Sequence, residues 1–250
     1  MSNDVAATEP QNDILTPVFR LSYPQLFTAK AYGKNAKPEY SMIMIFPKDE
    51  QSRLVGTMKA AGLDDLSIRA SFSPEVSLPN PNTGKAVAAF GALKRAASAA
   101  AMKKWQDRCQ NPDFFKALRS PFRPGDDGSY GTKDGFGPDV IFIKATSKRD
   151  QPELFHADGK TKITQERDLY GGCFARAVIS AAAYDPTEKG EPGKKGVSFY
   201  VRLVQFVRGG PSFGGGGSKA SLIDDVQGAP STPSTGTGST GGSAPSIGGW

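Results

Sequence analysis

Cysteine and histidine, the residue types that most often bind metals or carry out covalent catalysis, are scarce in this chain. Its 250 residues include two cysteines, Cys109 and Cys173, and one histidine, His156. Neither cysteine lies in a CxxC motif or a Cys/His cluster, which excludes a zinc site or a disulfide scaffold as the basis of the fold. The single histidine excludes chemistry that needs two imidazoles, and we predict no cofactor.

Long apolar runs are absent as well. No window approaches the length of about 18 uninterrupted apolar residues that a membrane-spanning helix needs. The opening MSNDVAATEPQND contains acids and no basic stretch followed by an apolar one, unlike a secretory signal. We therefore expect a cytoplasmic protein. A GxxxxGK[ST] phosphate loop is also missing, since GEPGKKG at 190–196 has a different spacing and no Ser or Thr after its lysines.

Basic residues exceed acidic ones, and the excess lies in the middle of the chain. The whole sequence has 31 Lys and Arg against 25 Asp and Glu, for a net charge of +6. Residues 14–208 hold 30 of the basic and 20 of the acidic residues, which gives this stretch a net charge of +10. Such an excess attracts polyanions and releases their counterions. A merely solvated surface would carry the same charge, so charge alone does not decide between the two interpretations.

Composition divides the chain into three parts. Residues 1–13 are predicted to be a flexible N-terminus, 14–208 a folded domain and 209–250 a disordered tail. Gly, Ser, Thr and Pro fill 29 of the 42 tail positions, and such a composition cannot bury enough apolar surface to become ordered. Two islands interrupt the tail: SLIDDV, with Asp224 and Asp225, and IGGW, with Trp250. We predict that they dock a protein partner; the alternative is a purely solubilising tail.

Period-two alternation and β-branched residues predict strands within 14–208. The predicted strands are Leu15–Tyr23, Tyr40–Phe46, Asp139–Thr146, Gly172–Tyr184 and Val197–Val207, of which the last two are long enough to curl or bulge. The segment Asp185–Gly196 joins these two into a hairpin with a long basic loop that includes Lys195. Strands at both ends of the chain, without regular strand–helix alternation, predict a small antiparallel barrel carrying helical insertions.

Two helical insertions are predicted. The first begins at an Asp49 cap and runs to about Ala61, with Gly62 as its stop. The second spans about Lys85–Cys109, where apolar residues recur at helical spacing: Phe90, Leu93, Ala97, Ala101 and Trp105. That stripe is most simply explained by core packing.

Acidic pairs raise the question of catalysis, because a metal-dependent nuclease needs converging carboxylates. The pairs Asp64-Asp65 and Asp126-Asp127 both stand beside turn glycines, where solvated aspartates are common. We predict a protein without catalytic residues. The alternative is a nuclease or recombination enzyme that uses Asp126, Asp127 and Asp139.

Aromatic and basic residues share faces of the last two predicted strands. Sequence-tolerant binding of single strands needs Lys and Arg along the phosphates and aromatic rings on which bases stack. Alternation places two groups of such residues opposite small or branched apolar ones: Phe174, Arg176 and Tyr184 on one strand, and Tyr200 and Arg202 on the next. These faces predict a barrel wall that contacts nucleic acid. Val204 and Phe206 would extend the Tyr200 face, so part of it needs cover.

A second aromatic and basic group follows the first predicted strand. It comprises Arg20, Tyr23, Phe27, Lys30, Tyr32, Lys34 and Lys37. As a loop at the barrel rim, this group is predicted to cap a nucleic-acid strand lying in a groove. Half-buried packing is the alternative for any single tyrosine, whereas the group as a whole favours binding.

Several of these segments resemble a known family. The succession RLSYPQLFTAKAYG, YSMIMIFPKD, an Ala/Lys helix ending in Trp, LYGGCFARAVISAAAYD and KKGVSFYVRLVQFVRGG is similar to that of phage-type single-stranded DNA-binding proteins of the OB-fold class. The resemblance covers about residues 15–211. It implies a mainly β protein, an OB-fold-like antiparallel five-stranded barrel with inserted helices, which coats single-stranded DNA in phage replication, recombination or repair within a bacterial host cell.

The resemblance also implies a binding surface on this chain. Its members would be Tyr23, Phe27, Tyr32, Tyr170, Phe174, Arg176, Tyr200 and Arg202. Many such proteins end in an acidic tip that recruits replication partners, whereas here the acids Asp224 and Asp225 lie inside the tail. Single-stranded DNA is thus the predicted partner, with replication or recombination proteins as further partners through the tail. RNA is the nearest alternative ligand, because stacking and phosphate contacts hardly distinguish the sugars.

Overall fold

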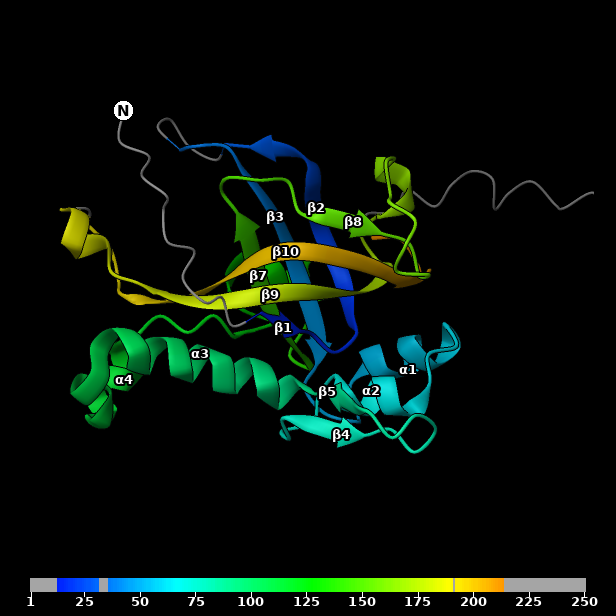
Figure 1. Cartoon of the computed structure of the whole chain (residues 1–250), viewed down its shortest axis with the longest axis horizontal. Coiled ribbons are helices and arrows are strands. Elements are labelled where there is room, and N and C mark those ends of the chain that lie inside the picture. The colour runs from blue at the N-terminus through cyan, green and yellow to red at the C-terminus, as the bar shows by residue number, and fades with distance from the viewer. Residues whose placement is uncertain (1–12, 32–35, 191, 214–250) are drawn as a thin grey trace, which may run out of the picture. The chain divides into compact units, whose positions relative to one another are not determined.

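A computed structural model describes residues 13–31, 36–190 and 192–213 (Figure 1). Five of its strands pair into a closed ring, in the order β2 (Phe19–Lys30), β3 (Glu39–Pro47), β7 (Val140–Ser147), β10 (Gly196–Arg208), β9 (Phe174–Tyr184) and back to β2. This is the five-stranded arrangement of an OB-fold. It confirms the predicted mainly β, OB-fold-like architecture, and four strand ranges match the predicted ones within a few residues.

One neighbouring pair in the ring is parallel, so the prediction of a wholly antiparallel barrel is wrong at this seam. β7 and β10 run in the same direction, with Phe199 opposite Ala145 and Tyr200 opposite Thr146. The other four pairs are antiparallel. A ring with an odd number of strands cannot alternate direction all the way round, because its last and first strands would then point the same way.

Shorter strands also pair with strands of the ring, so the sheet as a whole is not a strict barrel. β1 (Ile14–Leu15) pairs with β9, β6 (Arg123–Pro124) with β7, and β8 (Glu153–Phe155) with β10. β4 (Ser77–Pro79) and β5 (Ala86–Ala88) form a separate hairpin. Pro17 lies between β1 and β2, outside both ladders, where its missing N–H disrupts no strand pairing.

Side chains that point into the ring form the main core, and a bulge keeps β10 in register with it. Val197, Phe199 and Val201 of β10 are buried at odd positions, and Val204 is buried at an even one. The pairing of β9 with β10 shifts between Val201 and Leu203, which reverses the alternation. Tyr200 therefore points outward while Val204 faces the core, and the bulge predicted for this strand is confirmed.

Helix α3 (Phe90–Trp105) packs against β9 and β10 (Figure 1). All five residues of the predicted apolar stripe are among its buried residues, which confirms their role in core packing. A 3-10 turn η1 (Gln106–Gln110) and helix α4 (Pro112–Ala117) follow it. Three more 3-10 turns are η2 (Gly128–Thr132), η3 (Glu166–Asp168) and η4 (Pro186–Lys189). Within the described ranges, no helix has the length and apolar character needed to cross a membrane.

Helices α1 (Arg53–Ala60) and α2 (Asp65–Ala70) cover part of the outer face of the ring. Leu54 and Met58 of α1 belong to a second buried cluster with Ile45 of β3 and Phe142 of β7, whose side chains point away from the ring interior. The side chains at one end of the outer face are thus buried like those of the main core. Only the rest of the outer face is open to a ligand.

The predicted cap of α1 is wrong, because Ser52 rather than Asp49 begins the helix. The Ser52 hydroxyl accepts a hydrogen bond from the Leu54 N–H and donates one to Asp139 at 3.0 Å. The Arg53 N–H donates to the same carboxylate at 2.8 Å, so Asp139 supplies a second cap from the turn before β7. Asp49 accepts from the Gln51 N–H, just before the helix. Gly62 follows the helix end with φ 75°, as its predicted role as a stop requires.

Asp139 is expected to stabilise the protein only while its carboxylate is ionised. Hydrogen bonds from Arg53, whose guanidinium lies 2.8 Å from Oδ1, lower the pKa of Asp139 to about 2. The stabilisation is complete above about pH 5 and is lost as the pH falls toward 2, because the unfolded chain takes up its proton first. Asp139→Asn should lower the free energy of unfolding by about 1 kcal/mol at pH 7, a modest value because Arg53 is exposed.

Thermal melts at pH 7 and at pH 2.5 measure this effect. The gap between the parent protein and Asp139→Asn should shrink at the lower pH, and Asp49→Asn, which removes a carboxylate outside the helix, should have a smaller effect at pH 7. A gap that does not change with pH would contradict the role assigned to the charge.

The described chain continues past the predicted domain boundary at 208 and packs back on the ring. The Tyr170 hydroxyl donates to the Gly210 carbonyl at 2.9 Å and accepts from the Gly210 N–H at 3.1 Å. The Phe213 N–H donates to the Gly171 carbonyl at 2.9 Å. The tail islands that contain Asp224, Asp225 and Trp250 lie outside the described residues, as do residues 1–12.

Candidate nucleic-acid interface

Two hollows on the outer face of the ring share a lining residue. The first, of about 600 Å³, lies over β7 and β10 and is bordered by the β9–β10 hairpin and by residues 119–123. The second, of about 340 Å³, lies between the Tyr23 region of β2 and residues 129–133. Lys144 of β7 lines both hollows. We name the two hollows together the sheet groove.

The floor of the sheet groove includes most of a row of residues on neighbouring strands. Strand register places Ser41, Thr146, Tyr200 and Ser180 side by side, on β3, β7, β10 and β9. Three of the four have small side chains, so the half-buried Tyr200 ring is the one large group on this row. A ring that projects from such a floor offers a face on which a base can stack.

Tyr23 and Tyr130 form one wall of the groove. The pairing of β2 with β3 shifts between Ser22 and Gln25, and Tyr23 has φ 45°, a left-handed conformation that is uncommon for a residue with a side chain. This bulge turns the Tyr23 ring outward and leaves the residue 47% exposed. Its ring lies edge-to-face with that of Tyr130, at 6.4 Å between centroids. Tyr130 in turn packs on Phe142, at 4.8 Å.

The β9–β10 hairpin forms the other end of the groove and reaches beyond the ring (Figure 1). Tyr184 lines the groove opposite Gly196, where an added Cβ would lie 2.9 Å from the tyrosine hydroxyl. A side chain at position 196 would therefore displace this ring. Beside it, the Lys195 ammonium lies 2.7 Å from Asp185, and this hydrogen bond lowers the pKa of Asp185.

Basic side chains surround the floor of the groove. Those that line it are Lys104, Arg119, Arg123, Lys133, Lys144 and Lys148. They come from α3, from the segment before β7, from β7 itself and from the residue that follows it, so they surround the row that contains Tyr200. The phosphates of a strand whose bases lie on that row would pass among these cations, an arrangement suited to a polyanion.

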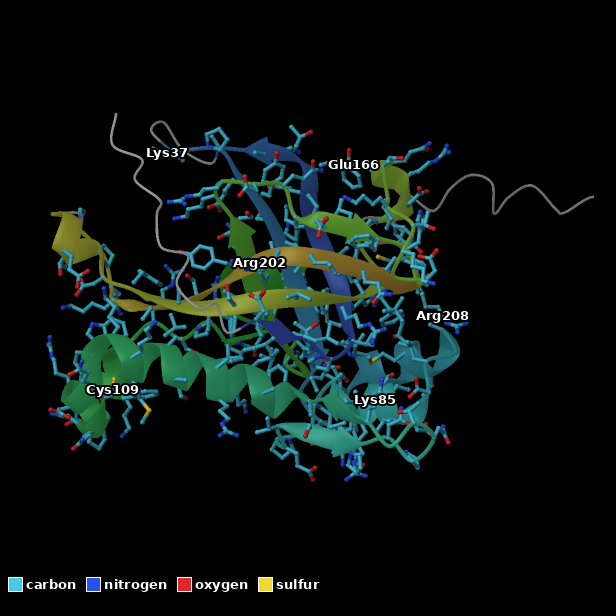
Figure 2. The ribbon with its side chains drawn as sticks, in the orientation of Figure 1. Lys37, Lys85, Cys109, Glu166, Arg202 and Arg208 are labelled. Carbon is cyan, nitrogen blue, oxygen red and sulfur yellow. The ribbon has the colours of Figure 1, made fainter. Side chains whose placement is uncertain are left out.

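Five of the predicted site residues lie in or near this groove. Tyr23, Tyr184 and Tyr200 line it, and Lys195 stands at its hairpin end. Arg202 is on β10 beyond Tyr200 (Figure 2), and its Nε lies 3.1 Å from Asp13. The structure thus brings together three predicted rings that are far apart in the sequence.

Other predicted site residues are placed elsewhere. Arg176 donates a hydrogen bond to Gln205 at 2.9 Å, and Phe27 packs partly against the main core. Lys30 is exposed at the end of β2, so this part of the predicted rim loop is strand. Tyr32 and Lys34 fall outside the described residues.

Arg20, Tyr170 and Phe174 do not line the groove; they hold the segment 209–213 on the ring. Arg20 is 9% exposed, donates to the Pro211 carbonyl at 2.8 Å and lies 4.2 Å from the centre of the Phe213 ring. Phe174 is fully buried in the second cluster. Alternation places Phe174 outside the ring, but α1 and the returning chain cover that end of the outer face. We therefore correct their assignment from DNA binding to structure.

Arg20→Ala is expected to lower the free energy of unfolding by about 1–3 kcal/mol and to leave oligonucleotide affinity unchanged. The change removes the donors to the Gly172 and Pro211 carbonyls and leaves both acceptors without that partner. Urea denaturation measures the first effect and a binding titration the second. Lys30→Ala, an exposed cation on the same strand, should barely change stability. Lost affinity at unchanged stability would return Arg20 to the binding surface.

Sequence reasoning missed Tyr130 and most of the cations of the groove. A signal for Lys144 was present, since it is a lone charge in the apolar strand Val140–Ser147 and alternates with Phe142 and Thr146. Tyr130 and Lys133 lie in an irregular Gly/Asp/Pro segment whose path over β7 no periodicity reveals.

The acids of the nuclease alternative have other partners or lie in a turn. Asp139 pairs with Arg53, and Asp127 pairs with Arg123 at 2.6 Å. Asp126 is an exposed turn residue. In the described part of the chain, no three His, Cys, Asp or Glu side chains gather where they could hold a metal ion.

Comparisons with known proteins identify a family and a relative to which this chain is similar. A family model described as the single-stranded DNA-binding protein of Enterobacter phage Enc34 matches residues 69–229. A curated relative, the putative protein p50 of Acyrthosiphon pisum secondary endosymbiont phage 1, is 30% identical over 125 residues, half of this chain. The match spans 59% of that relative's length.

Solved structures of phage proteins are similar at low identity. The single-stranded DNA-binding protein of bacteriophage Enc34 in complex with ssDNA is 16% identical, with a TM-score of 0.47 over 81% of this chain and 89% of that one. The same protein in another structure is 20% identical, with a TM-score of 0.42 over 84% and 88%. The single-stranded DNA-binding protein gp2.5 of bacteriophage T7 is 13% identical, with a TM-score of 0.41 over 81% and 94%.

Proposed function

Because the chain belongs to the family of the single-stranded DNA-binding protein of Enterobacter phage Enc34, we propose that it binds single-stranded DNA along the sheet groove. The observation that supports this most is the gathering of tyrosine rings and cations along one groove on the outer face of the sheet. Bases would stack on Tyr200 and Tyr184 and on the Tyr23–Tyr130 wall, and phosphates would contact the surrounding Lys and Arg. Neither contact reads base identity, so binding tolerates any sequence.

The proposed role needs no chemistry at the DNA. The protein would coat and protect single strands in phage replication, recombination or repair, in the cytoplasm of the host cell, and would act without a catalytic residue. Lys195 and Arg202, which are paired with Asp185 and Asp13, would contribute little to phosphate binding.

A titration with fluorescent oligothymidylate at several salt concentrations tests the proposal. We expect binding that weakens as salt rises and that exceeds binding to a duplex of equal length. No binding, or an affinity indifferent to salt, would contradict it. An RNA strand that competes equally would widen the ligand to single strands of either sugar.

Removing cations of the groove tests whether the groove itself determines binding. Lys133→Ala combined with Lys148→Ala should weaken oligothymidylate binding and flatten the plot of log affinity against log salt by about 1.4, since each single-strand phosphate contact contributes about 0.7. Lys85→Ala with Arg95→Ala removes two exposed cations that do not line the groove and should change neither quantity. Equal losses in both double variants would mean that net charge, and not the groove, determines binding.

A further inference from the structure

Carboxylates stand inside the groove proposed for a polyanion. Glu39, at the start of β3, lies 3.0 Å from the Lys144 ammonium, and Glu188, in the β9–β10 hairpin, lies 2.8 Å from that of Lys104. Both acids line the same hollow as Tyr200. An acid at such a position repels phosphate, so its presence needs a functional reason.

Much of the positive charge at the groove is already neutralised by intramolecular ion pairs. Besides these two pairs, Arg123 pairs with Asp127 at 2.6 Å, and Lys195 beside the groove pairs with Asp185 at 2.7 Å. Three groove cations have no carboxylate within 4.0 Å in the described ranges: Arg119, Lys133 and Lys148. Four of the seven cations are thus paired before any DNA arrives.

An ion pair within the protein changes what a cation contributes to binding. Affinity for nucleic acid comes largely from the release of counterions condensed on the phosphates. A lysine that keeps its carboxylate neutralises no phosphate, and one that leaves it exposes an acid to the DNA. Either way the electrostatic part of binding is weakened, while stacking on the rings is untouched.

We propose that Glu39 and Glu188 are specificity-determining residues, which weaken the attraction of the groove for polyanions in general and so make binding depend on unpaired bases. The inference rests on the proposed function. A duplex offers phosphates but keeps its bases stacked within the helix, so it gains only the electrostatic part of binding. A single strand gains stacking as well. Each cation contributes more to duplex binding than to single-strand binding, about 0.9 against about 0.7 in the salt slope, so neutralising cations weakens duplex binding more.

The salt dependence of the parent protein's affinity shows whether only the unpaired cations or all seven cations contact phosphates. If only the three unpaired cations act, log affinity for a single strand should fall with log salt at a slope of about −2. If all seven cations act, the slope should be about −5. The inference requires the shallower slope, and a slope near −5 would overturn it.

The direct test is the variant Glu39→Gln with Glu188→Gln, titrated with oligothymidylate and with a duplex of equal length between 50 and 300 mM salt. We expect the slope to steepen by about 1.4 for the single strand and by about 1.8 for the duplex. The ratio of single-strand to duplex affinity should fall at least about threefold at low salt, because the duplex gains more from each freed cation. Glu153→Gln is the matched control, since it frees Lys162, whose ion pair does not line the groove.

The outcomes separate this inference from the proposed function. Unchanged slopes and an unchanged ratio in a parent protein that binds oligothymidylate would overturn the inference alone. Weaker single-strand binding by the variant would also overturn it, because Glu39 and Glu188 would then serve to position their lysines. A parent protein that binds no oligonucleotide would overturn both proposals. A thermal melt shows that each variant is folded before it is titrated.

Discussion

Replacing Tyr23 and Tyr200 together by alanine is expected to weaken oligothymidylate binding by about 2–4 kcal/mol, roughly thirty- to a thousandfold. Each ring that stacks on a base contributes about 1–3 kcal/mol. Tyr200 stands among small residues on the floor of the groove, and the β2 bulge holds Tyr23 on its wall, 47% exposed. Neither ring is fully buried, so the loss should appear in affinity rather than in stability.

Fluorescence anisotropy with labelled oligothymidylate measures this loss, and two controls define its cause. Tyr23→Phe with Tyr200→Phe keeps both rings and should retain most of the affinity. Phe155→Ala removes a half-buried ring on β8, outside the groove, and should leave affinity unchanged. Full affinity in the double alanine variant would show that these rings do not touch the bases.

Phe174→Ala is expected to have the largest effect on stability, a loss of about 3–5 kcal/mol in the free energy of unfolding. The side chain is fully buried in the second cluster, and its ring lies within about 3 Å of where a Cβ on Gly210 would be. Removing the ring leaves a cavity between β9, α1 and the returning chain. Urea denaturation monitored by circular dichroism gives the change directly.

Phe174→Leu keeps the position filled in case the alanine variant does not fold. It should lose less stability and should bind oligothymidylate as the parent protein does. A Phe174→Leu protein that keeps its stability but binds DNA weakly would contradict the structural role and restore the residue to the interface.

Alternation along the last two predicted strands identified two of the tyrosines that line the groove, and Tyr23 came from the aromatic and basic group after the first predicted strand. Tyr184 and Tyr200 face outward, as the alternation predicts, because period two fixes which side of a strand each residue occupies. The same rule fails as a guide to exposure at Phe174. It separates inside from outside of the ring, but it cannot tell that α1 and residues 209–213 cover one end of the outside.

Bulges and covering loops explain most of the remaining differences between the predicted and the observed structure. The β2 bulge at Tyr23 depends on long-range pairing with β3, and it makes strand out of residues that composition suggests are a rim loop. The bulge at Arg202 resolves the conflict between Tyr200 and Val204, which no strict alternation allows. Ion pairs such as Glu39–Lys144 join residues 105 positions apart, so the neutralised state of the groove is invisible to a local pattern.

A crystal structure of the protein with oligothymidylate tests the central claim most directly. We predict bases stacked on Tyr200 and against the Tyr23–Tyr130 wall, with phosphates near Lys133 and Lys148. A strand bound across the exposed side of α3, or over the Arg20 and Tyr170 contacts, with the sheet groove left empty, would contradict the account.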